Sequence, residues 1–388
     1  MGAAEMETLS SVLTSPAALS SGGWRERFEE RFRELCGSRH ALTVTSGTVA
    51  LEIAVHLLDL RPGDEVVVTP QTYQATVQPL LGHDVTVRFC DVEPDSLNMD
   101  PDKLAPLLTD RTRAVILVHY GGWPAEMDRI VKLAHEVDAL VVEDCAHSLG
   151  GAVDGRRPGA LGDIGCFSFH SSKNITTLGE GGMITFDRDD WATRVDRIRS
   201  NEVDGEYYPV PAAGVPAELR WMKYAQSAYG IGCSRVRRAG TNATLSEAAC
   251  AVGLVQLDRL TEMADRRRHI TNRLNEVISR YPGVRAQHPR DGIRHAHHLY
   301  TFFAGDRVRR ARILAELDRR GIELQLRYFP LHLTPEWRAL GHGDGECPVA
   351  ERLWFTEHIN LPCQPVLTDA QIDHLVWALD VTLAGTAV

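Results

Sequence analysis

The sequence contains very little lysine. Only four of its 42 lysine and arginine residues are lysines, and these are Lys103, Lys132, Lys173 and Lys223. Both side chains carry a positive charge, but only the lysine amine readily loses its proton and forms a Schiff base. A chain that uses arginine at almost every basic position is therefore expected to keep some lysines for chemistry.

The sequence also lacks a run of about 18 apolar residues, which a membrane-spanning helix requires. Residues 1–5 include an acid and lead into no apolar stretch, so a signal peptide is not expected. The formal net charge is -10 at pH 7, whereas nucleic-acid-binding proteins usually present a concentrated basic face. We interpret the arginine clusters at 235–238 and 266–268 as solvated surfaces or as anion contacts near a ligand. A soluble, cytoplasmic protein that binds neither membranes nor nucleic acids is predicted.

No two cysteines have the C-x-x-C spacing, although the chain contains eight. Several of them lie within apolar runs, as buried and reduced thiols do. Zinc sites and the disulfide frameworks of small secreted proteins use closely spaced cysteines in recognisable patterns. We therefore expect reduced thiols, no disulfide framework and no metal site.

Strand-like and helical patterns alternate through the first half of the chain. The predicted strands are mostly apolar and lie near residues 40–45, 65–68, 85–89, 114–118 and 139–142. Helical patterns precede and separate them, near residues 24–32, 49–55, 75–81, 101–108 and 125–137. This alternation indicates an α/β fold with a mainly parallel sheet that is covered by helices on both faces.

The second half of the chain has a different pattern. A long helix is predicted from about residue 245 to 278, followed by a mixture of strands and helices near residues 298–303, 307–320, 322–326 and 369–383. A chain of 388 residues exceeds the usual size of a single domain. We predict an N-terminal arm at 1–22, a large domain at 23–255 and a small C-terminal α+β domain at 256–388.

Polar residues follow several of the predicted strands. Ligands of parallel α/β sheets gather at the carboxyl ends of the strands, so the functional site is expected among these residues. They are Ser46 to Thr48, Thr72 and Tyr73, His119 and Tyr120, Asp144 to His147, and Ser168 to Lys173.

Considered alone, each of these segments also has a structural interpretation. Residues 46–48 join a strand to a helix, so they either hold a phosphate on free backbone N–H groups or simply cap the helix. Asp144 follows a buried strand and either contacts a cationic ring nitrogen or serves as a cap or ion-pair partner. His147 alone would more often be a structural histidine.

Lys173 differs from the other lysines in its surroundings. Lys103 and Lys132 lie in amphipathic helical patterns, and no strand end or glycine cluster flanks Lys223. Lys173 follows an apolar strand and precedes the glycine cluster at 179–182. We therefore predict that Lys173 is the reactive lysine and not a surface loop residue.

The motifs around Lys173 resemble those of the DegT/DnrJ/EryC1/StrS family of sugar aminotransferases, which have the aspartate aminotransferase fold type I. The resemblance rests on Phe-Ser-Phe-His-x-x-Lys-Asn at 167–174, Gly-Glu-Gly-Gly at 179–182 and Glu-Asp-x-Ala-His at 143–147. It extends over nearly the whole chain, from about residue 28 to residue 379. It implies an enzyme that uses pyridoxal 5'-phosphate, with pyridoxamine 5'-phosphate as the aminated form. The implied reaction moves an amino group from glutamate or glutamine to a nucleotide-linked keto-sugar or a keto-cyclitol, in antibiotic or cell-surface sugar biosynthesis.

The resemblance assigns roles to the residues at matching positions. Lys173 would form the Schiff base with the cofactor and carry the proton between cofactor and substrate carbon. Asp144 would contact the pyridine nitrogen, His147 the ring-oxygen side and Tyr73 the face of the ring. The implied phosphate ligands are Gly47, Thr48 and Ser168.

The resemblance also implies a homodimer with shared active sites, because Asn242 matches a residue that reaches the phosphate of the neighbouring subunit. Arg238 and His332 are predicted substrate contacts. The N-terminal region departs from the family pattern, since it lacks the proline-rich lead-in and the glycine-tryptophan hairpin. The long segment at 201–239 is expected to cap the site and to influence the choice of substrate.

Three other functions remain open from the sequence. A dehydratase of the same family uses pyridoxamine phosphate but has histidine in place of the lysine, so Lys173 weighs against it. An aminodehydroquinate-type synthase would share the family motifs. A non-catalytic regulator would keep the cofactor fold, but it has no need for the intact set of lysine, aspartate and phosphate-binding residues.

Overall fold

The computed structural model describes residues 1–20, 22–210, 230–289 and 291–386. Lys223 and the adjoining part of the 201–239 segment lie outside the described residues. The chain forms two compact units, one made of residues 1–187 and 245–388 and the other of residues 188–244. The predicted boundary between a large domain at 23–255 and a small domain at 256–388 stays a prediction.

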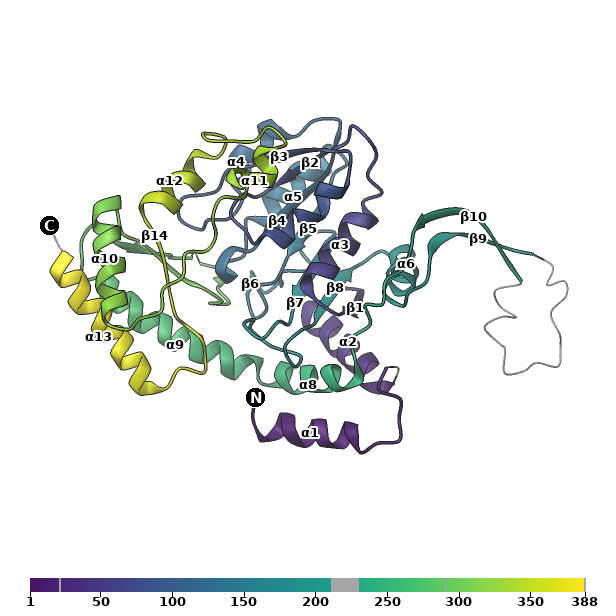
Figure 1. The fold of residues 1–388 in the computed structure, drawn as a ribbon, viewed down its shortest axis with the longest axis horizontal. Coiled ribbons are helices and arrows are strands. Elements are labelled where there is room, and N and C mark those ends of the chain that lie inside the picture. Colours follow the sequence, from purple (N-terminus) through teal and green to yellow (C-terminus); the bar gives the residue numbers. More distant parts are fainter. Residues whose placement is uncertain (21, 211–229, 290, 387–388) are drawn as a thin grey trace. The chain divides into compact units, whose positions relative to one another are not determined.

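A seven-stranded sheet lies at the centre of the first unit (Figure 1). Its strands are β1 (His40–Val44), β2 (Glu65–Val68), β3 (Thr86–Phe89), β4 (Thr112–Val118), β5 (Leu140–Asp144), β7 (Ile164–Ser168) and β8 (Gly182–Phe186). They follow the order β1-β8-β7-β5-β4-β2-β3. The five strands from β7 to β3 are parallel, and β8 runs antiparallel to both β7 and β1. The predicted mainly parallel α/β sheet is confirmed.

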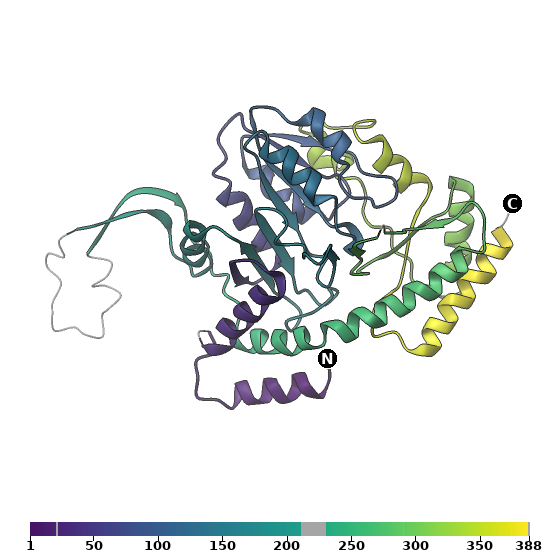
Figure 2. The ribbon, with the colours of Figure 1, turned by 180° about the vertical axis from the view of Figure 1, so that it is seen from behind.

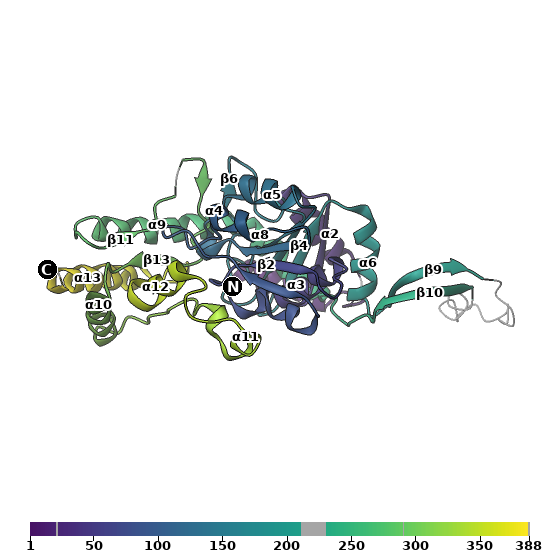
Figure 3. The ribbon, with the colours of Figure 1, turned by 90° about the horizontal axis from the view of Figure 1, so that it is seen from above.

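Helices cover both faces of this sheet. Helices α3 (Gly47–Leu57) and α5 (Met127–His135) lie on opposite sides of β2 and β4 (Figure 3). Ile130 of α5 belongs to a buried cluster with Val115 of β4. Helix α2 (Gly23–Cys36) packs through Phe32 on Phe167 of β7, with the two ring centroids 4.8 Å apart. Because the central strands are buried from both sides, their sequences are mostly apolar.

Proline breaks two of the predicted helices into short pieces. The segment predicted as a helix at 75–81 forms the 3-10 helices η1 (Gln74–Thr76) and η2 (Gln78–Gly82), with Pro79 at the start of η2. The segment predicted at 101–108 forms α4 (Pro101–Leu104) and the 3-10 helix η3 (Ala105–Leu107), which contains Pro106. Proline has no N–H to donate and disfavours a helical preceding residue, so a continuous α-helix cannot form across either position.

The predicted N-terminal arm contains a helix, and its role as an arm stays a prediction. Residues 3–13 form helix α1 (Ala3–Leu13), which packs on α8 (Glu247–Asp258). The buried carboxylate of Glu5 accepts hydrogen bonds from Gln256 at 2.6 Å and from Arg259 at 2.8 Å. Alanine, glutamate, methionine and leucine are strong helix formers, and they dominate this segment.

The C-terminal part of the first unit contains a second, smaller sheet. Helix α8 is followed after Arg259 by α9 (Leu260–Ile278), which runs beside α13 (Asp369–Thr386) (Figure 2). Helix α10 (Arg307–Arg319) packs on α13, and the antiparallel strands β11 (Arg285–Ala286), β13 (Tyr300–Phe303) and β14 (His358–Leu361) complete this part. Ile270, Phe302, Ile313 and Leu379 belong to its buried core. The predicted α+β character is confirmed.

Residues 322–326 are one of the segments predicted as a strand, and this prediction is wrong. This segment forms only an isolated bridge between Gln325 and Asn360, and residues 326–330 have no regular secondary structure. The backbone that follows bonds to side chains far away in the sequence: the N–H of Arg327 to Asn360, and the carbonyl of Tyr328 to Gln71. These bonds place Arg327 and Tyr328 beside the pocket described below.

The second unit contains helix α6 (Asp189–Arg199) and the antiparallel strands β9 (Asp204–Pro209) and β10 (Ile231–Arg238). The guanidinium of Arg197 lies over the ring of Tyr207, 4.3 Å from its centroid. Asn242 forms an isolated bridge with Ser200. In neither unit is a described helix long and apolar enough to cross a lipid bilayer.

Candidate active site

A pocket of about 610 Å³ opens at the carboxyl ends of the parallel strands in the first unit. It brings together residues that lie far apart in the sequence and that were predicted from the ends of four strands. These pocket residues are Gly47, Thr48, Tyr73, Asp144, His147, Ser168 and Lys173.

The start of helix α3 forms an anion-binding cradle at one end of the pocket. The side chain of Ser46 caps the helix by accepting the N–H of Val49 at 3.2 Å. The N–H groups of Gly47 and Thr48 have no acceptor within the helix, and the positive end of the helix dipole lies there. A side chain at Gly47 would bring its Cβ to 2.8 Å from Cβ of Ser168, so only glycine leaves the cradle open.

The carboxylate of Asp144 is buried and held in one orientation. Its Oδ2 accepts a hydrogen bond of 2.6 Å from the Thr76 hydroxyl, and its Oδ1 accepts the N–H of Ala146 at 2.9 Å. The Thr76 hydroxyl is in turn bonded to that of Thr72 at 2.7 Å. Because these donors are neutral, the negative charge of Asp144 stays available to a cationic group in the pocket.

Lys173 lies just beyond β7 in the same pocket. Burial lowers its pKa from 10.5 to about 8, because an ammonium group loses solvation there. The negative charge of Asp144 opposes this shift, and the positive charge of Arg327 adds to it. At pH 7 about one Lys173 amine in ten is therefore neutral, and thus nucleophilic, whereas an unperturbed lysine is almost entirely charged there.

His147 lies between two other rings. Its ring is nearly parallel to those of His298 and Tyr328, with centroid separations of 4.4 and 5.8 Å. Its Nε2 bonds to the Tyr328 hydroxyl at 3.1 Å, and burial holds the pKa of His147 well below its usual value. The ring is therefore neutral at neutral pH.

The pocket residues fit a phosphate-bearing pyridine ring. The cradle at Gly47 suits a phosphate, and the charge of Asp144 suits a protonated ring nitrogen. The buried Nδ1 of His147 has no hydrogen-bond partner among the described residues. An unpartnered buried nitrogen is costly, and a polar atom of a bound ring would remove that cost. The chemistry of this donor set thus agrees with the cofactor that the sequence predicts.

Tyr73 lies at the rim of the pocket and is 53% exposed. Its ring centroid is 6.1 Å from that of Tyr328, and the two rings are tilted by 56°. Burial raises the pKa of Tyr328 to about 12, so its hydroxyl keeps its proton. The aromatic side chain of Tyr73 is available to cover a bound ring, and this role stays a prediction.

Two pocket residues were missed from the sequence. Arg327 and Tyr328 line the pocket although they come from the C-terminal half of the chain. They directly follow the segment that was predicted as a strand at 322–326. No strand forms there, so the rule that ligands gather at strand ends offered no valid signal for them, and their place depends on tertiary hydrogen bonds.

Three other predicted residues do not line this pocket. His332 is fully buried, and its Nε2 bonds to Oε1 of Glu351 at 2.9 Å. Its ring packs near Phe89, which leaves it no surface for a substrate contact. Arg238 and Asn242 belong to the second unit, at the end of β10 and in the bridge to Ser200. Their roles stay predictions.

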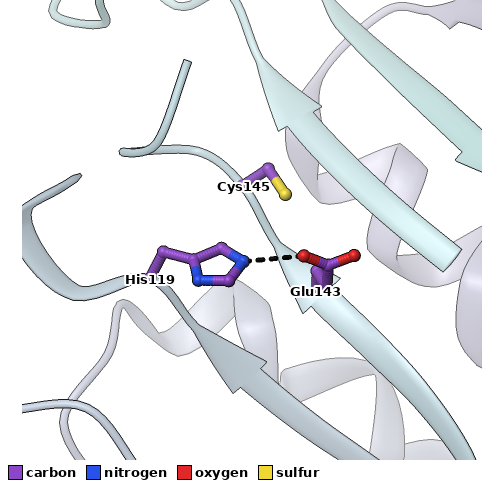
Figure 4. A group of neighbouring side chains, drawn as sticks. All are labelled: His119, Glu143 and Cys145. Carbon is purple, nitrogen blue, oxygen red and sulfur yellow. Dashed lines mark hydrogen bonds and ion pairs between the residues drawn. The ribbon is translucent and has the colours of Figure 1, made fainter. Parts of the chain in front are cut away.

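A cluster of His119, Glu143 and Cys145 lies beside the end of β5 (Figure 4). His119 Nδ1 accepts the N–H of Ala125 at 3.0 Å, so its proton is on Nε2 and is donated to Glu143 at 2.8 Å. The Glu143 carboxylate also accepts three backbone N–H groups at 2.7 to 3.0 Å, from Gly159, Leu161 and Gly162. Burial raises the pKa of the Cys145 thiol, which keeps it protonated. Since every ligand atom is engaged or protonated, this cluster fastens the 159–162 loop and does not suit a metal ion.

Relatives of known type are similar to this chain along its whole length. The spore coat polysaccharide biosynthesis protein SpsC of Bacillus subtilis is 31% identical over 98% of this chain and 94% of its own length. The GDP-perosamine synthase of Caulobacter vibrioides is 32% identical over 94% of this chain and 91% of its own.

Solved structures of aminotransferases have the same fold. The aminotransferase TlmJ from Streptoalloteichus hindustanus is 30% identical, with a TM-score of 0.85 over 99% of this chain and 97% of that chain. DesV from S. venezuelae, solved in complex with a ketimine intermediate, is 28% identical, with a TM-score of 0.83 over 98% and 94%. The family model of the DegT/DnrJ/EryC1/StrS aminotransferases matches residues 1–380. Together with the pocket around Lys173, these similarities lead to one conclusion: the chain belongs to the DegT/DnrJ/EryC1/StrS aminotransferase family.

Proposed function

We propose that this protein transfers the amino group of L-glutamate or L-glutamine to the keto group of a nucleotide-linked sugar or a cyclitol, with pyridoxal 5'-phosphate as cofactor. The observation that supports it most is one pocket in which Lys173, with a pKa of about 8, lies with Asp144 and the cradle at Gly47. The sugar acceptor is supported by the relatives, which include a GDP-perosamine synthase.

In this proposal each pocket residue has a defined task. When bound, the cofactor would withdraw electrons from the reacting carbon and hold the amino group between the two halves of the reaction. Nζ of Lys173 would move a proton from the donor carbon to the cofactor in the first half-reaction, and from the cofactor to the acceptor carbon in the second. Asp144 would hold the protonated ring nitrogen and His147 the ring-oxygen side. Tyr73 would cover the ring, and the phosphate would be bound by Gly47, Thr48 and Ser168.

We also infer that the protein works as a cytoplasmic homodimer. In the family pattern Asn242 reaches the phosphate in the neighbouring subunit, which would give two shared sites. A reducing compartment is consistent with the eight cysteines, which are all free thiols, with only Cys233 exposed.

Cofactor attachment tests the role of Lys173 directly. Apoprotein mixed with pyridoxal phosphate is expected to develop an absorbance band, and borohydride should fix the cofactor to the peptide that contains Lys173. Lys173→Ala should abolish the fixed adduct. Lys132→Ala, which changes an exposed lysine on α5, is the matched control and should label normally. A reducible adduct that persists in Lys173→Ala would refute the assignment.

Half-reaction spectra test the enzymatic function. L-glutamate or L-glutamine should convert the loaded protein to its pyridoxamine form, and an added keto-sugar or keto-cyclitol should reverse the spectral change. A non-catalytic regulator would show neither change. A panel of nucleotide-linked keto-sugars and free keto-cyclitols, each tested for reversal, would identify the acceptor class.

A further inference from the structure

His298 lies just before strand β13 and contacts two residues of the candidate active site. Its buried ring stacks on that of His147, with the centroids 4.4 Å apart and the planes 15° from parallel. Its Nδ1 lies 3.1 Å from Oδ1 of Asn174, the residue that directly follows Lys173. His298 is not part of the sequence motifs that contain His147, Lys173 and Asn174, so only the folded chain reveals these contacts.

The hydrogen bonds of Asn174 determine which nitrogen of His298 carries the proton. Nδ2 of Asn174 donates to the carbonyls of Leu149 at 2.8 Å and of Ala296 at 3.3 Å. A flipped amide would place Oδ1 against these two carbonyl oxygens, so the network fixes Oδ1 toward His298. Because Oδ1 can only accept, Nδ1 of His298 donates to it.

The ring of His298 is neutral at neutral pH and carries its one proton on Nδ1. Burial holds the pKa of His298 well below its usual value, and the positive charge of Lys173 adds to this shift. The buried Nε2 has no hydrogen-bond partner among the described residues, which is costly. An apolar ring would avoid that cost, so a histidine at this position indicates a use for its Nδ1–H group.

Both contacts of His298 hold groups whose positions the proposed chemistry requires. Nε2 of His147 bonds to the Tyr328 hydroxyl at 3.1 Å, and a ring held by one hydrogen bond can still tilt about it. Stacking on His298 restricts that tilt and so fixes the direction of Nδ1 of His147. Asn174 is held by three hydrogen bonds and thereby fixes the backbone next to Lys173. His298 thus joins the two groups, so that the imidazole and the reactive amine keep a constant spacing.

We propose that His298 is a positioning residue with two separable tasks. The face of its ring sets the plane of His147, and its Nδ1–H group sets the place of Lys173 through Asn174. The proposal rests on the proposed aminotransferase function, because it requires the cofactor in the pocket, and it deepens that function. It adds to the site a residue from the C-terminal half of the chain that does not itself line the pocket.

Two variants separate the tasks. His298→Phe keeps a ring that can stack on His147 but has no donor for Asn174. His298→Asn loses the ring face, but its amide N–H can take the place of the Nδ1–H group. The matched control is His332→Phe, because His332 is also buried but bonds to Glu351 and does not line the pocket. Urea unfolding establishes that each variant is folded.

Two measurements report on the two tasks without turnover. Pyridoxamine 5'-phosphate has no aldehyde and cannot form a Schiff base with Lys173, so its dissociation constant reports on the ring contacts that His147 makes. The rate at which saturating pyridoxal 5'-phosphate becomes fixable by borohydride reports on the position of the Lys173 amine.

The two variants are expected to change different quantities. His298→Asn should raise the dissociation constant of pyridoxamine 5'-phosphate about tenfold, because the stack is lost, and should leave the attachment rate nearly unchanged. His298→Phe should lower the attachment rate about tenfold, because the amine is misplaced, at an unchanged dissociation constant. His332→Phe should change neither quantity.

A variant that keeps the quantity it is expected to lose, or an equal loss of both quantities in both variants, would overturn the proposal. If one of the two variants does not fold, His298→Gln takes its place. Glutamine has neither the ring nor a donor at the position of Nδ1, so both quantities should suffer. A loss of only one of them in His298→Gln would likewise refute the two-task assignment.

The same proteins separate this inference from the proposed function. Addition of L-glutamate or L-glutamine to the loaded unmodified protein tests the function, whereas the two measurements above require no donor. If no donor reacts but the variants separate the two quantities, the aminotransferase function fails and the positioning role stands. If a donor reacts but the variants do not separate them, the positioning role fails and the function stands.

Discussion

At the scale of single residues, opposing charges around Lys173 set the ionisation of its amine. Burial lowers its pKa to about 8, Asp144 favours the charged form and Arg327 disfavours it. Attack on the cofactor aldehyde requires the neutral amine. The balance between the two neighbours therefore decides at which pH the apoprotein takes up its cofactor.

The rate of cofactor uptake is expected to rise with pH through a midpoint near 8 and then to level off. Asp144→Asn removes an anion that favours the ammonium form, so it should lower the pKa of Lys173 and move the midpoint to lower pH. Arg327→Gln removes a cation, so it should move the midpoint to higher pH. Stopped-flow absorbance of apoprotein mixed with pyridoxal phosphate, from about pH 6 to pH 10, measures both. The ionisations of the cofactor itself are common to all three proteins. Shifts in the same direction would contradict this account.

A second prediction at this scale concerns Gly47, because the structure has no room for a methyl group at this position. In Gly47→Ala the new Cβ would lie 2.8 Å from Cβ of Ser168 and 3.3 Å from the carbonyl oxygen of Phe167. We expect the start of α3 to shift, with a loss of roughly 1–3 kcal/mol in the free energy of unfolding. Cofactor affinity should fall at least about tenfold as the cradle narrows.

The control for this change is Gly23→Ala at the start of α2, where a Cβ meets nothing within 4 Å. It should leave both the unfolding free energy and the cofactor affinity nearly unchanged. Urea unfolding and a fluorescence titration with pyridoxal phosphate give the two quantities. Normal cofactor affinity in Gly47→Ala would show that the cradle does not bind the phosphate.

At the scale of elements, the pocket depends on a segment that is neither helix nor strand. Within it the backbone of residues 327 and 328 is fixed by Gln71, which follows β2, by Tyr120, which follows β4, and by Asn360 of β14. The Tyr120 hydroxyl is central to this arrangement because it bonds both the Arg327 carbonyl and Nε2 of His358, the latter at 3.0 Å. Loosening the segment should therefore affect the pocket as well as the stability of the protein.

Tyr120→Phe tests this dependence. The loss of one buried hydrogen-bond donor should cost about 1–3 kcal/mol in the free energy of unfolding. Because the Arg327 backbone is released, the half-saturating donor concentration should also rise severalfold. Tyr281→Phe is a control, since its partly buried hydroxyl bonds to Asp380 at 2.6 Å at the edge of the core around α9 and α13, away from the pocket lining. It should lower stability without changing donor affinity, and a similar donor effect in both variants would contradict the argument.

The secondary-structure elements also show which parts of the fold could be predicted from the sequence and which could not. The ends of β2, β5 and β7 were predictable because strands buried on both faces are apolar runs that stop abruptly. Hydrophobic patterning did not reveal the break at Pro79 or the helical N-terminus, since both depend on local propensities that it ignores. Arg327 was missed for a different reason. Its place in the pocket results from tertiary hydrogen bonds to Tyr120 and Asn360, which no local pattern encodes.

At the scale of the whole molecule, the proposed shared sites require two subunits. Within one chain the pocket already contains the lysine, the aspartate and the cradle. Asn242 belongs to the other compact unit of the chain, and its predicted partner is the phosphate in the neighbouring subunit. Under this proposal the oligomeric state would be linked to cofactor binding.

Mixed dimers test this link. Lys173→Ala and Asn242→Ala are each expected to be nearly inactive as homodimers. If the sites are shared, a dimer of one subunit of each kind contains one site with both residues intact and one site with neither. Refolding the two variants together should then restore about a quarter of the normal activity at equal amounts, by random pairing of subunits. No recovery in dimers confirmed by sedimentation would refute shared sites.

The end of β5 carries two neighbouring carboxylates in different environments. Glu143 is saturated by His119 and three backbone N–H groups, while the next residue, Asp144, keeps its charge available to the pocket. Successive strand residues point to opposite faces of a sheet, so a slip of one position would turn each of these two side chains to the opposite face. Pairing with β4 and β7 on both sides prevents such a slip. A single-residue deletion within β5 that draws the following residues back by one would therefore be far more damaging than most substitutions there, because Asp144 would take the place of Glu143 against the 159–162 loop and Cys145 would take the place of Asp144 in the pocket.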